Sequence, residues 1–276
     1  MNLLFIGDIV GRPGRDLVRR HVRALAASHG AHLVIANGEN AAGGAGITRD
    51  NANEVLAAGV DVITTGNHVW DKRETLEFIG NEPRLLRPAN YPAGTPGAGS
   101  CVVTGTNGVR VGVINVMGRV FLLAIDDPFR VAEREIARVK EDGAQIIFVD
   151  MHAETTSEKL ALCYYLDGRV AAVIGTHTHV QTADERILPG GTACLTDAGF
   201  TGPHDGVIGI EKEAVIARFV TGLPGRFETA SGDPRLNGVS ITVDPSTGRA
   251  THIERISLSE DQLKEITDNA TAAARP

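Results

Sequence analysis

Two histidines, His177 and His179, stand one residue apart in the segment Gly175-Thr176-His177-Thr178-His179. This segment directly follows the apolar run 170–174, which is typical of a buried strand. Alternate side chains share a face in a strand and can flank one point in a turn, so both imidazoles can reach a common centre. Neutral imidazole is a common metal ligand, and the pair therefore indicates a metal site. Two unrelated loop histidines would produce the same pattern.

Polar residues follow several other predicted strands in the same way. The apolar runs 3–6, 32–36, 60–64 and 145–149 end in Gly7-Asp8, Gly38-Glu39-Asn40, Gly66-Asn67-His68 and Asp150-Met151-His152. Ligands of open α/β sheets bind outside the carboxyl ends of the strands, so these positions suit a site. Each residue alone can also be a turn residue or a helix cap, because Asn and Asp favour such positions. Their repetition at successive strand ends favours one shared site.

Together the strand ends offer carboxylate, carboxamide and imidazole groups without a thiolate. The candidates are Asp8, Glu39, Asn40, Asn67, His68, His152, His177 and His179. Such ligands suit Mn, Fe or Zn rather than a soft metal. The set is too large for one tetrahedral ion and fits two ions that share a carboxylate. Two metals roughly 3.5 to 4 Å apart stabilise the attacking and leaving oxygens of a displacement at phosphorus, so phosphoester hydrolysis is the predicted reaction.

The elements that must position these residues alternate between strand and helix, which predicts an α/β fold. Helices are predicted at 15–29, 48–58, 71–80, 126–141 and 155–166. Residues 101–103 and 109–116 predict a hairpin through Asn107-Gly108, and 215–221, 238–243 and 251–257 predict antiparallel strands of a second sheet. A short helix from Ser259 is expected to fray into Ala274-Arg275-Pro276. We expect a single domain over residues 1–276, because site residues lie on both sides of the Pro- and Gly-rich loop 81–99.

Two nucleotide-binding motifs are excluded by glycine spacing. Gly7, Gly11 and Gly14 do not match the dinucleotide fingerprint, and no Gly-Lys-Ser/Thr follows as a phosphate-binding loop requires. Two other features leave alternatives open. The apolar segment 120–123 can line a substrate pocket or, as we prefer, fill the core. A polar, glycine-rich turn is predicted at 197–203, and its Asp197 is expected to be a turn residue or to orient a ligand.

Composition limits the partners. The chain of 276 residues has a net charge of -7 and only 4% aromatic residues, which argues against binding of long nucleic acid. A small phosphate ester is compatible with this charge. The three cysteines are far apart and odd in number, so we expect them to be reduced and buried. The amino terminus lacks a basic flank and a long apolar run, which predicts no signal peptide, no membrane span and a cytoplasmic location.

The four strand ends named above and the paired-histidine segment form five motifs. In this order they resemble the motifs of the calcineurin-like metallophosphoesterases, and the resemblance covers nearly the whole chain to about Ser257. That family usually has a histidine two residues after the first aspartate and an aspartate in the bridging position. This chain has Val10 and Glu39 there. Glu39-Asn40 and Thr196-Asp197-Ala198-Gly199-Phe200-Thr201-Gly202-Pro203 are similar to a bacterial branch of phosphodiesterases acting on 2',3'-cyclic nucleotides, in which the asparagine replaces the missing histidine.

The resemblance implies a four-layer α/β/β/α sandwich, with two mixed sheets flanked by helices. It implies a first metal held by Asp8, Asn40 and His179, a second held by Asn67, His152 and His177, and Glu39 as the bridge. The metals would be two divalent or mixed-valence ions of iron or manganese, with zinc as an option. A bridging hydroxide would attack phosphorus, and His68 would protonate or stabilise the leaving oxygen.

The implied substrate is a small phosphodiester, above all a 2',3'-cyclic nucleotide. A phosphomonoesterase and a non-hydrolytic regulatory protein that binds metal and nucleotide stay open as alternatives. A homo-oligomer also stays open. So does a single ion bound by both His177 and His179.

Overall fold

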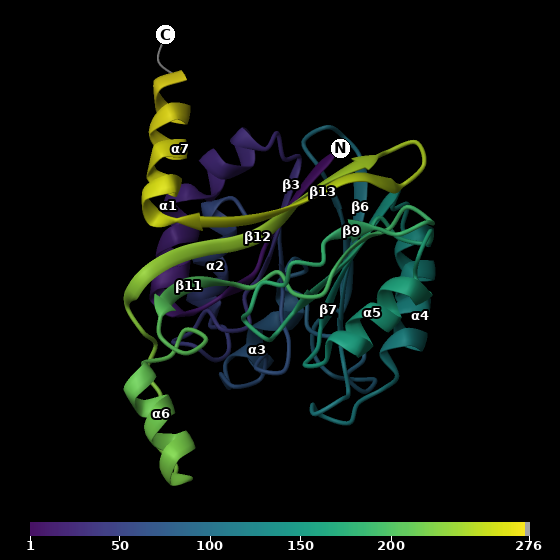
Figure 1. The fold of residues 1–276 in the computed structure, drawn as a ribbon. Helices are drawn as coiled ribbons and strands as arrows, with labels where there is room; N and C mark the ends of the chain where they lie inside the picture. The colour runs from purple at the N-terminus through teal and green to yellow at the C-terminus, as the bar shows by residue number, and fades with distance from the viewer. Residues whose placement is uncertain (274–276) are drawn as a thin grey trace.

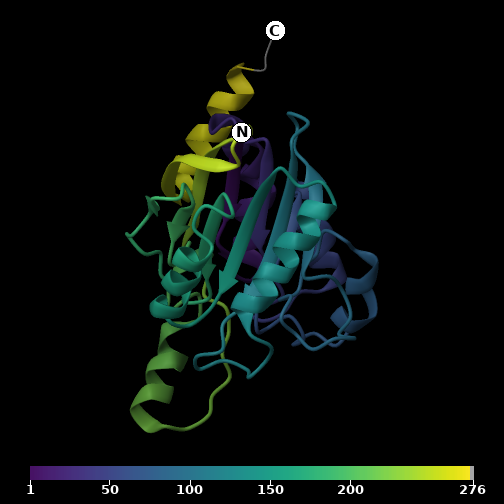
Figure 2. The ribbon, with the colours of Figure 1, turned by 90° about the vertical axis from the view of Figure 1, so that its right-hand side faces the viewer.

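Two β-sheets face each other in the computed structural model, which describes residues 1–273 (Figures 1 and 2). The first sheet has the order β2-β11-β12-β1-β3-β4, with β13 added to β12. Its strands are β1 (Asn2–Ile6), β2 (Asp8–Ile9), β3 (Leu33–Asn37), β4 (Val62–Thr64), β11 (Phe200–Asp205), β12 (Gly232–Asp244) and β13 (Arg249–Ser259). The strand β1 pairs parallel with β3 and antiparallel with β12, so this sheet is mixed.

The second sheet has the order β5-β6-β7-β8-β10-β9. Its strands are β5 (Ser100–Thr104), β6 (Arg110–Met117), β7 (Ile146–His152), β8 (Ala172–Thr176), β9 (Arg186–Ile187) and β10 (Ala193–Leu195). The strands β6, β7 and β8 run parallel, while β5 and β6 form the predicted antiparallel hairpin. This sheet is therefore mixed as well.

Helices cover the outer face of each sheet. Those on the first sheet are α1 (Gly11–Ser28), α2 (Arg49–Ala58) and α7 (Glu260–Ala273), and those on the second are α4 (Pro128–Glu141) and α5 (Thr156–Tyr165). Between the sheets lies an apolar layer in which the rings of Phe5 and Phe148 pack with centroids 5.1 Å apart. The four-layer α/β/β/α prediction is thus confirmed. Thr48 caps α2, since its hydroxyl accepts from the backbone N–H of Asn51 at 3.2 Å.

Alternation in the sequence was misleading at residues 215–221. The structure has a helix there, α6 (Lys212–Thr221), which ends at Gly222 with a left-handed φ of 71°. Val215 is the single buried residue of this helix. The spacing of the apolar side chains of the helix therefore does not indicate which face packs against the protein. The helix projects away from the body of the molecule (Figure 1). The strand prediction is therefore wrong at this place.

Three further expectations about the elements need correction. The strands β12 and β13 exist, but β12 pairs with β1 and so joins the first sheet rather than the second. The predicted helix over 71–80 shrinks to α3 (Thr75–Phe78), followed by the short 3-10 helix η1 (Ile79–Asn81). Residues 200–203 of the turn predicted at 197–203 belong instead to the strand β11 (Phe200–Asp205), which pairs with β2 and β12. These elements depend on contacts with residues that are distant in sequence, and the local sequence pattern does not contain that information.

The apolar segment 120–123 does not fill the core as preferred. Phe121 is 87% exposed, and Val120 and Leu123 are exposed as well. Only Leu122 packs partly against the buried cluster beneath the first sheet. The loop leaves the second sheet after Met117 and lies at the surface until Pro128 begins α4.

The cysteine prediction is wrong in part. Cys163 of α5 and Cys194 of β10 form a disulfide, although 31 residues separate them. They meet because α5 packs on the sheet in which β10 pairs with β8. Cys101 is free, and burial raises the pKa of its thiol to about 12.

The carboxyl-terminal helix α7 begins at Glu260, close to the expected Ser259, and its Thr267 hydroxyl lies 2.8 Å from His21 Nδ1 of α1. The fraying expected at Ala274-Arg275-Pro276 lies outside the described residues. Within residues 1–273, none of the helices combines the length and the apolar character needed to cross a membrane.

Candidate metal centre

The predicted site residues all lie where the carboxyl ends of the parallel strands of both sheets meet. Asp8 belongs to β2, and Glu39 and Asn40 follow β3 in the first sheet. The second sheet contributes His152 at the end of β7 and the two histidines that follow β8. Asn67 and His68 follow β4. The structure therefore brings together eight side chains from two different sheets.

One group of ligand atoms surrounds Glu39. Oxygen and nitrogen atoms of Glu39, His152 and His177 all lie within 4.8 Å of one another. His152 Nε2 lies 3.2 Å from Glu39 Oε1, 3.1 Å from His177 Nδ1 and 2.9 Å from Asn67 Oδ1. These are the residues expected at the second metal.

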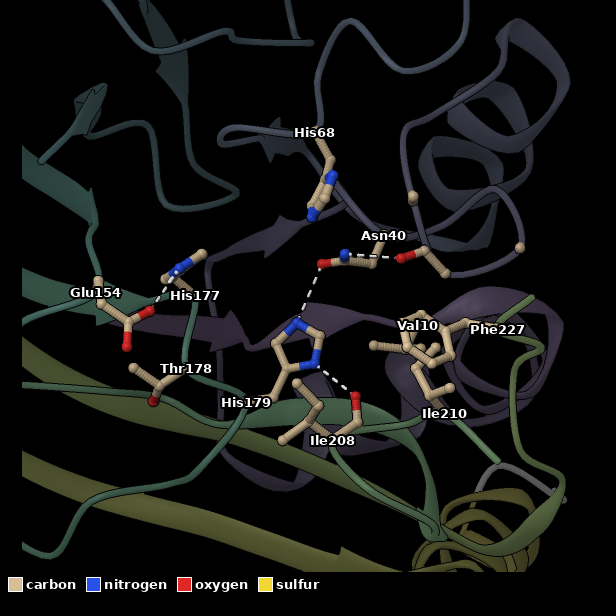
Figure 3. A pocket seen from close by; sticks show the side chains of 13 residues that line it. Val10, Asn40, His68, Glu154, His177, Thr178, His179, Ile208, Ile210 and Phe227 are labelled. Atoms are coloured by element: carbon tan, nitrogen blue, oxygen red, sulfur yellow. Dashed lines mark hydrogen bonds and ion pairs between the residues drawn. The ribbon is translucent and has the colours of Figure 1, made fainter. Parts of the chain in front are cut away.

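A second group lies around His179. Its Nε2 atom is 3.2 Å from Asn40 Oδ1 and 3.8 Å from Asp8 Oδ2 (Figure 3). The other carboxylate oxygen, Asp8 Oδ1, is buried and has no hydrogen-bond partner among the described residues. A buried polar atom without a partner is costly, and a cation would satisfy it. His177 and His179 thus face different groups of side chains.

Each of these histidines has its other ring nitrogen held by an acceptor. His179 Nδ1 donates to the carbonyl of Ile208 at 2.9 Å, so Nε2 is left as the free ligand atom. His177 Nε2 lies 2.9 Å from the Glu154 carboxylate, which leaves Nδ1 facing the His152 side. Both imidazoles are therefore oriented with one lone pair toward the other ligands.

His152 is oriented through a longer chain. The hydroxyl of Thr176 donates to Asp150 Oδ1 at 2.7 Å, so it accepts from His152 Nδ1–H at 2.9 Å. This leaves His152 Nε2 toward Glu39. Asp150 is completely buried and also accepts from Asn37 Nδ2 at 3.0 Å. The chain of hydrogen bonds fixes the ring of His152 inside the protein.

The two buried carboxyl groups of the centre, Asp8 and Glu39, need a positive charge beside them. Burial raises the pKa of Asp8 well above its usual value, and the nearby charge of Glu39 raises it further although His152 opposes both. Burial acts in the same direction on Glu39, but the charge and hydrogen bond of His152 outweigh it and lower the pKa to about 2. Burial would lower the pKa of His152, but Glu39 and Asp8 raise it to about 9. A divalent cation can take the place of the His152 proton as the counter-charge.

Burial favours the neutral form of the other two histidines. Burial, followed by the charge of His152, lowers the pKa of His177 to about 3. Burial also lowers the pKa of His179. Neutral imidazole is the form that binds metal, so both side chains are prepared for coordination.

The loop that carries the two histidines is held in an unusual conformation. His177 and His179 have left-handed φ values of 104° and 60°. Asp8 Oδ2 accepts from the backbone N–H of His177 at 3.0 Å, and Asp197 Oδ2 accepts from the backbone N–H of Thr178 at 3.1 Å. Such strain persists only where surrounding contacts compensate it, as these carboxylates do. Asp197 therefore orients the ligands, as the sequence led us to expect.

Sequence reasoning missed the partner of Asp197. Lys159 Nζ of α5 lies 2.7 Å from Asp197 Oδ2, and both side chains are only 1% exposed. Gly175 lies against this pair and the next strand, since a Cβ there would overlap the carbonyl oxygen of Thr196 and lie 2.8 Å from Lys159 Cδ. A lysine within a helix carries no signal of this role in the sequence. Glu154 and Thr176 were missed for the same reason, because their partners are distant in sequence.

His68 stands at the edge of the centre and is not among the converging ligand atoms. Its backbone N–H donates to Glu39 Oε2 at 3.1 Å, and its Nδ1 lies 2.8 Å from Asp71 Oδ2. Its side chain extends toward the space between Asn40 and His177 (Figure 3). The Asp71 carboxylate keeps the proton on Nδ1 and leaves Nε2 available to a bound molecule.

A pocket of about 430 Å³ opens above these side chains (Figure 3). Asn40, His68, Glu154, His177, Thr178 and His179 line its polar part. Its remaining lining is formed by Val10, Gly43, Gly44, Ala45, Ile208, Ile210 and Phe227. The size falls in the range of roughly 300 to 1,000 Å³ that is usual for small-molecule sites.

Known proteins resemble this chain over nearly its whole length. A 2',3'-cyclic-nucleotide 2'-phosphodiesterase from Bacillus subtilis (strain 168) is 52% identical over 263 residues, which cover 95% of this chain and 99% of the relative. The crystal structure of a hypothetical protein from Thermus thermophilus matches with a TM-score of 0.87 and 42% identity, covering 94% of this chain and 100% of the other.

The structure of a novel phosphatase from Mycoplasma pneumoniae also has a TM-score of 0.87, with 34% identity and 98% of both chains covered. These matches confirm the resemblance to the bacterial branch of the calcineurin-like metallophosphoesterases. The family described as YmdB-like protein matches residues 4–256. With this match and 52% identity to the Bacillus relative, the chain belongs to the YmdB-like family.

Proposed function

We propose that the chain is a dinuclear metal-dependent phosphodiesterase that hydrolyses small phosphodiesters, with 2',3'-cyclic nucleotides as the leading substrates. One observation carries the proposal: two adjacent groups of carboxylate, carboxamide and imidazole atoms converge, and three of their members, Asn40, His177 and His179, line one pocket. The enzyme class is supported by the names of the relatives, which are phosphodiesterases and phosphatases.

The donor set fits two hard or borderline metal ions. Asp8, Asn40 and His179 would hold one ion, and Asn67, His152 and His177 would hold the other, with Glu39 shared. Oxygen and imidazole donors suit iron, manganese or zinc, and we propose iron or manganese. When bound, such ions activate water and neutralise charge on the phosphoryl oxygens.

The residues of the chain supply orientation and a proton. Glu154, Thr176 and the carbonyl of Ile208 hold the ring protons of the ligand histidines away from the centre. His68, with its Nδ1 held by Asp71, would donate a proton from Nε2 to the leaving oxygen of the ester. The buried carboxylates of Asp8 and Glu39 would repel the phosphate group of a substrate unless bound cations offset their charge.

A matched set of variants tests the proposal. Purified protein supplied with Mn²⁺ is expected to cleave bis(p-nitrophenyl) phosphate. Glu39→Gln should abolish turnover, and His68→Ala should lower kcat by roughly 100- to 10,000-fold, the usual contribution of a general acid. His252→Ala is the control, because this histidine is exposed on β13. Unchanged rates in both the Glu39 and His68 variants would refute the proposal.

A phosphomonoesterase is the second candidate, because a similar structure is that of a phosphatase. Mono- and diesters of p-nitrophenol, assayed on one preparation, separate the two. Nucleotide binding without hydrolysis under Mn, Fe or Zn would instead favour a regulatory protein. Cytoplasmic location and homo-oligomerisation stay predictions.

A further inference from the structure

The pocket has two chemically different halves (Figure 3). The polar half is lined by three of the candidate metal ligands, Asn40, His177 and His179, and by His68. The side chains of Val10, Ile210 and Phe227 cluster on the opposite side in Figure 3, with Ile208 below His179. A ligand that fills both halves must combine an anionic group with an apolar body.

Apolar surface is left open in the second half. Phe227 is 41% exposed and Ile208 is 49% exposed, although both border a pocket rather than a crowded interior. Exposed apolar surface inside a concave site is unfavourable in water and is typical of a surface that a ligand covers. The glycines Gly43 and Gly44 form part of the same wall, where their missing side chains keep the space open.

The segment that carries Phe227 is anchored beside the pocket. The backbone N–H of Glu211 donates to the carbonyl of Glu228 at 3.0 Å, and that of Ala230 donates to the carbonyl of Gly209 at 2.9 Å. Thr229 bridges to Ile210 in the same antiparallel arrangement. Arg218 of α6 lies over the ring of Phe227, 5.5 Å from its centroid. The ring is thus positioned by the anchored residues 228–230 that follow it and by the guanidinium of Arg218.

We infer that Phe227, with Val10, Ile208 and Ile210, forms a subsite that stacks against the nucleobase of the substrate. The inference rests on the proposed phosphodiesterase function and names which part of a nucleotide the apolar half receives. Aromatic and aliphatic side chains stack on any base, because every base has a π-face. Among the described residues of this half, no side chain offers a hydrogen-bonding group to the edge of a base. The subsite therefore accepts adenine, guanine, cytosine and uracil alike.

The test compares a 2',3'-cyclic nucleotide with the cyclic phosphate of 1-O-methylribose, which has no base. The wild-type protein with Mn²⁺ should prefer the nucleotide in kcat/KM by roughly 10- to 100-fold, the effect of stacking one base on an aromatic side chain. Phe227→Ala should reduce this ratio to near one, and Phe227→Trp should preserve it. The four cyclic nucleotides should differ only a few fold from one another.

Phe219→Ala is the matched control. Phe219 is 84% exposed on α6 and does not line the pocket, so the variant should keep the wild-type ratio. An unchanged ratio in Phe227→Ala would overturn the subsite, as would a strong preference for one base.

A binding measurement separates this result from a failure of the proposed function. Calorimetry with the Mn²⁺-loaded protein should give a Kd for 3'-AMP that is roughly tenfold or more weaker in Phe227→Ala than in the wild type. Equal affinity of both proteins would refute the subsite even if the wild type hydrolyses diesters. Weakened binding in a protein that hydrolyses nothing would support the subsite and refute the phosphodiesterase.

Discussion

The buried ion pair of Lys159 and Asp197 offers a quantitative test of how the fold holds the histidine loop. We consider Lys159→Met, which keeps the length and apolar stem of the side chain and removes its charge. Asp197 would keep the N–H of Thr178 and of Gly199 as donors but would lose its counter-charge. The variant therefore isolates the charge of Lys159 from its packing.

The expected cost follows from burial. Because both side chains are 1% exposed, the value for a surface pair, about 0 to 1 kcal/mol, does not apply. Removing one partner of a buried pair leaves an uncompensated charge and costs about 3 to 5 kcal/mol. For a chain of this size that loss lowers Tm by roughly 6 to 20 °C. The paired change Lys159→Met with Asp197→Asn should lose less than the sum of the single changes, by about 1 to 3 kcal/mol.

Urea unfolding followed by circular dichroism measures these free energies, with Lys140→Met as the control because Lys140 is exposed on α4. The same proteins titrated with Mn²⁺ should bind it roughly 10- to 100-fold more weakly when Lys159 is changed, since Asp197 holds Thr178 between the two ligand histidines. A Lys159→Met protein as stable as the Lys140→Met control would refute the reasoning about burial. Normal Mn²⁺ affinity in a destabilised variant would refute the link to the loop.

Two further substitutions test the candidate centre itself. Glu154→Gln replaces the charged acceptor of His177 Nε2–H by a neutral one and should weaken Mn²⁺ binding by about tenfold in calorimetry. Glu265→Gln on α7 is the control and should bind Mn²⁺ as the wild type does. Equal affinities of the two variants would contradict the role of Glu154. Gly66→Ala places a Cβ that overlaps the ring of His152 and the carboxylate of Glu39, so the folded variant should lose the rise in Tm that Mn²⁺ gives the wild type. A rise equal to that of the wild type would show that the centre is not at these two residues.

The residue types and spacing of the candidate site could be predicted because each residue directly follows a strand. Asp8, Glu39, His152 and His179 are tied to runs whose apolar character identifies buried strands. Parallel strands place their carboxyl ends at one edge, so strand ends predict proximity without knowledge of the packing. The layered architecture came instead from resemblance, since alternating strands and helices alone do not determine how many sheets form.

Local pattern failed where burial is absent or where the partner is remote. The helix α6 has one buried residue, so its alternating apolar side chains suggested a strand that does not exist. The sequence gives no sign that Cys163 and Cys194 are neighbours. They meet because β10, which carries Cys194, pairs with β8, and α5, which carries Cys163, packs on the same sheet. The lack of packing around α6 and the meeting of α5 with β10 both depend on parts of the chain that are distant in sequence.

The sequence alone determined which chemical groups stand at the strand ends and that His177 and His179 suit a metal. Only the tertiary structure decided that the two histidines face different groups of side chains, His177 toward His152 and His179 toward Asn40. It also decided which ring nitrogen each presents, through Glu154 and the carbonyl of Ile208. Orientation depends on acceptors far away in sequence, and such contacts exist only once the two sheets have packed together.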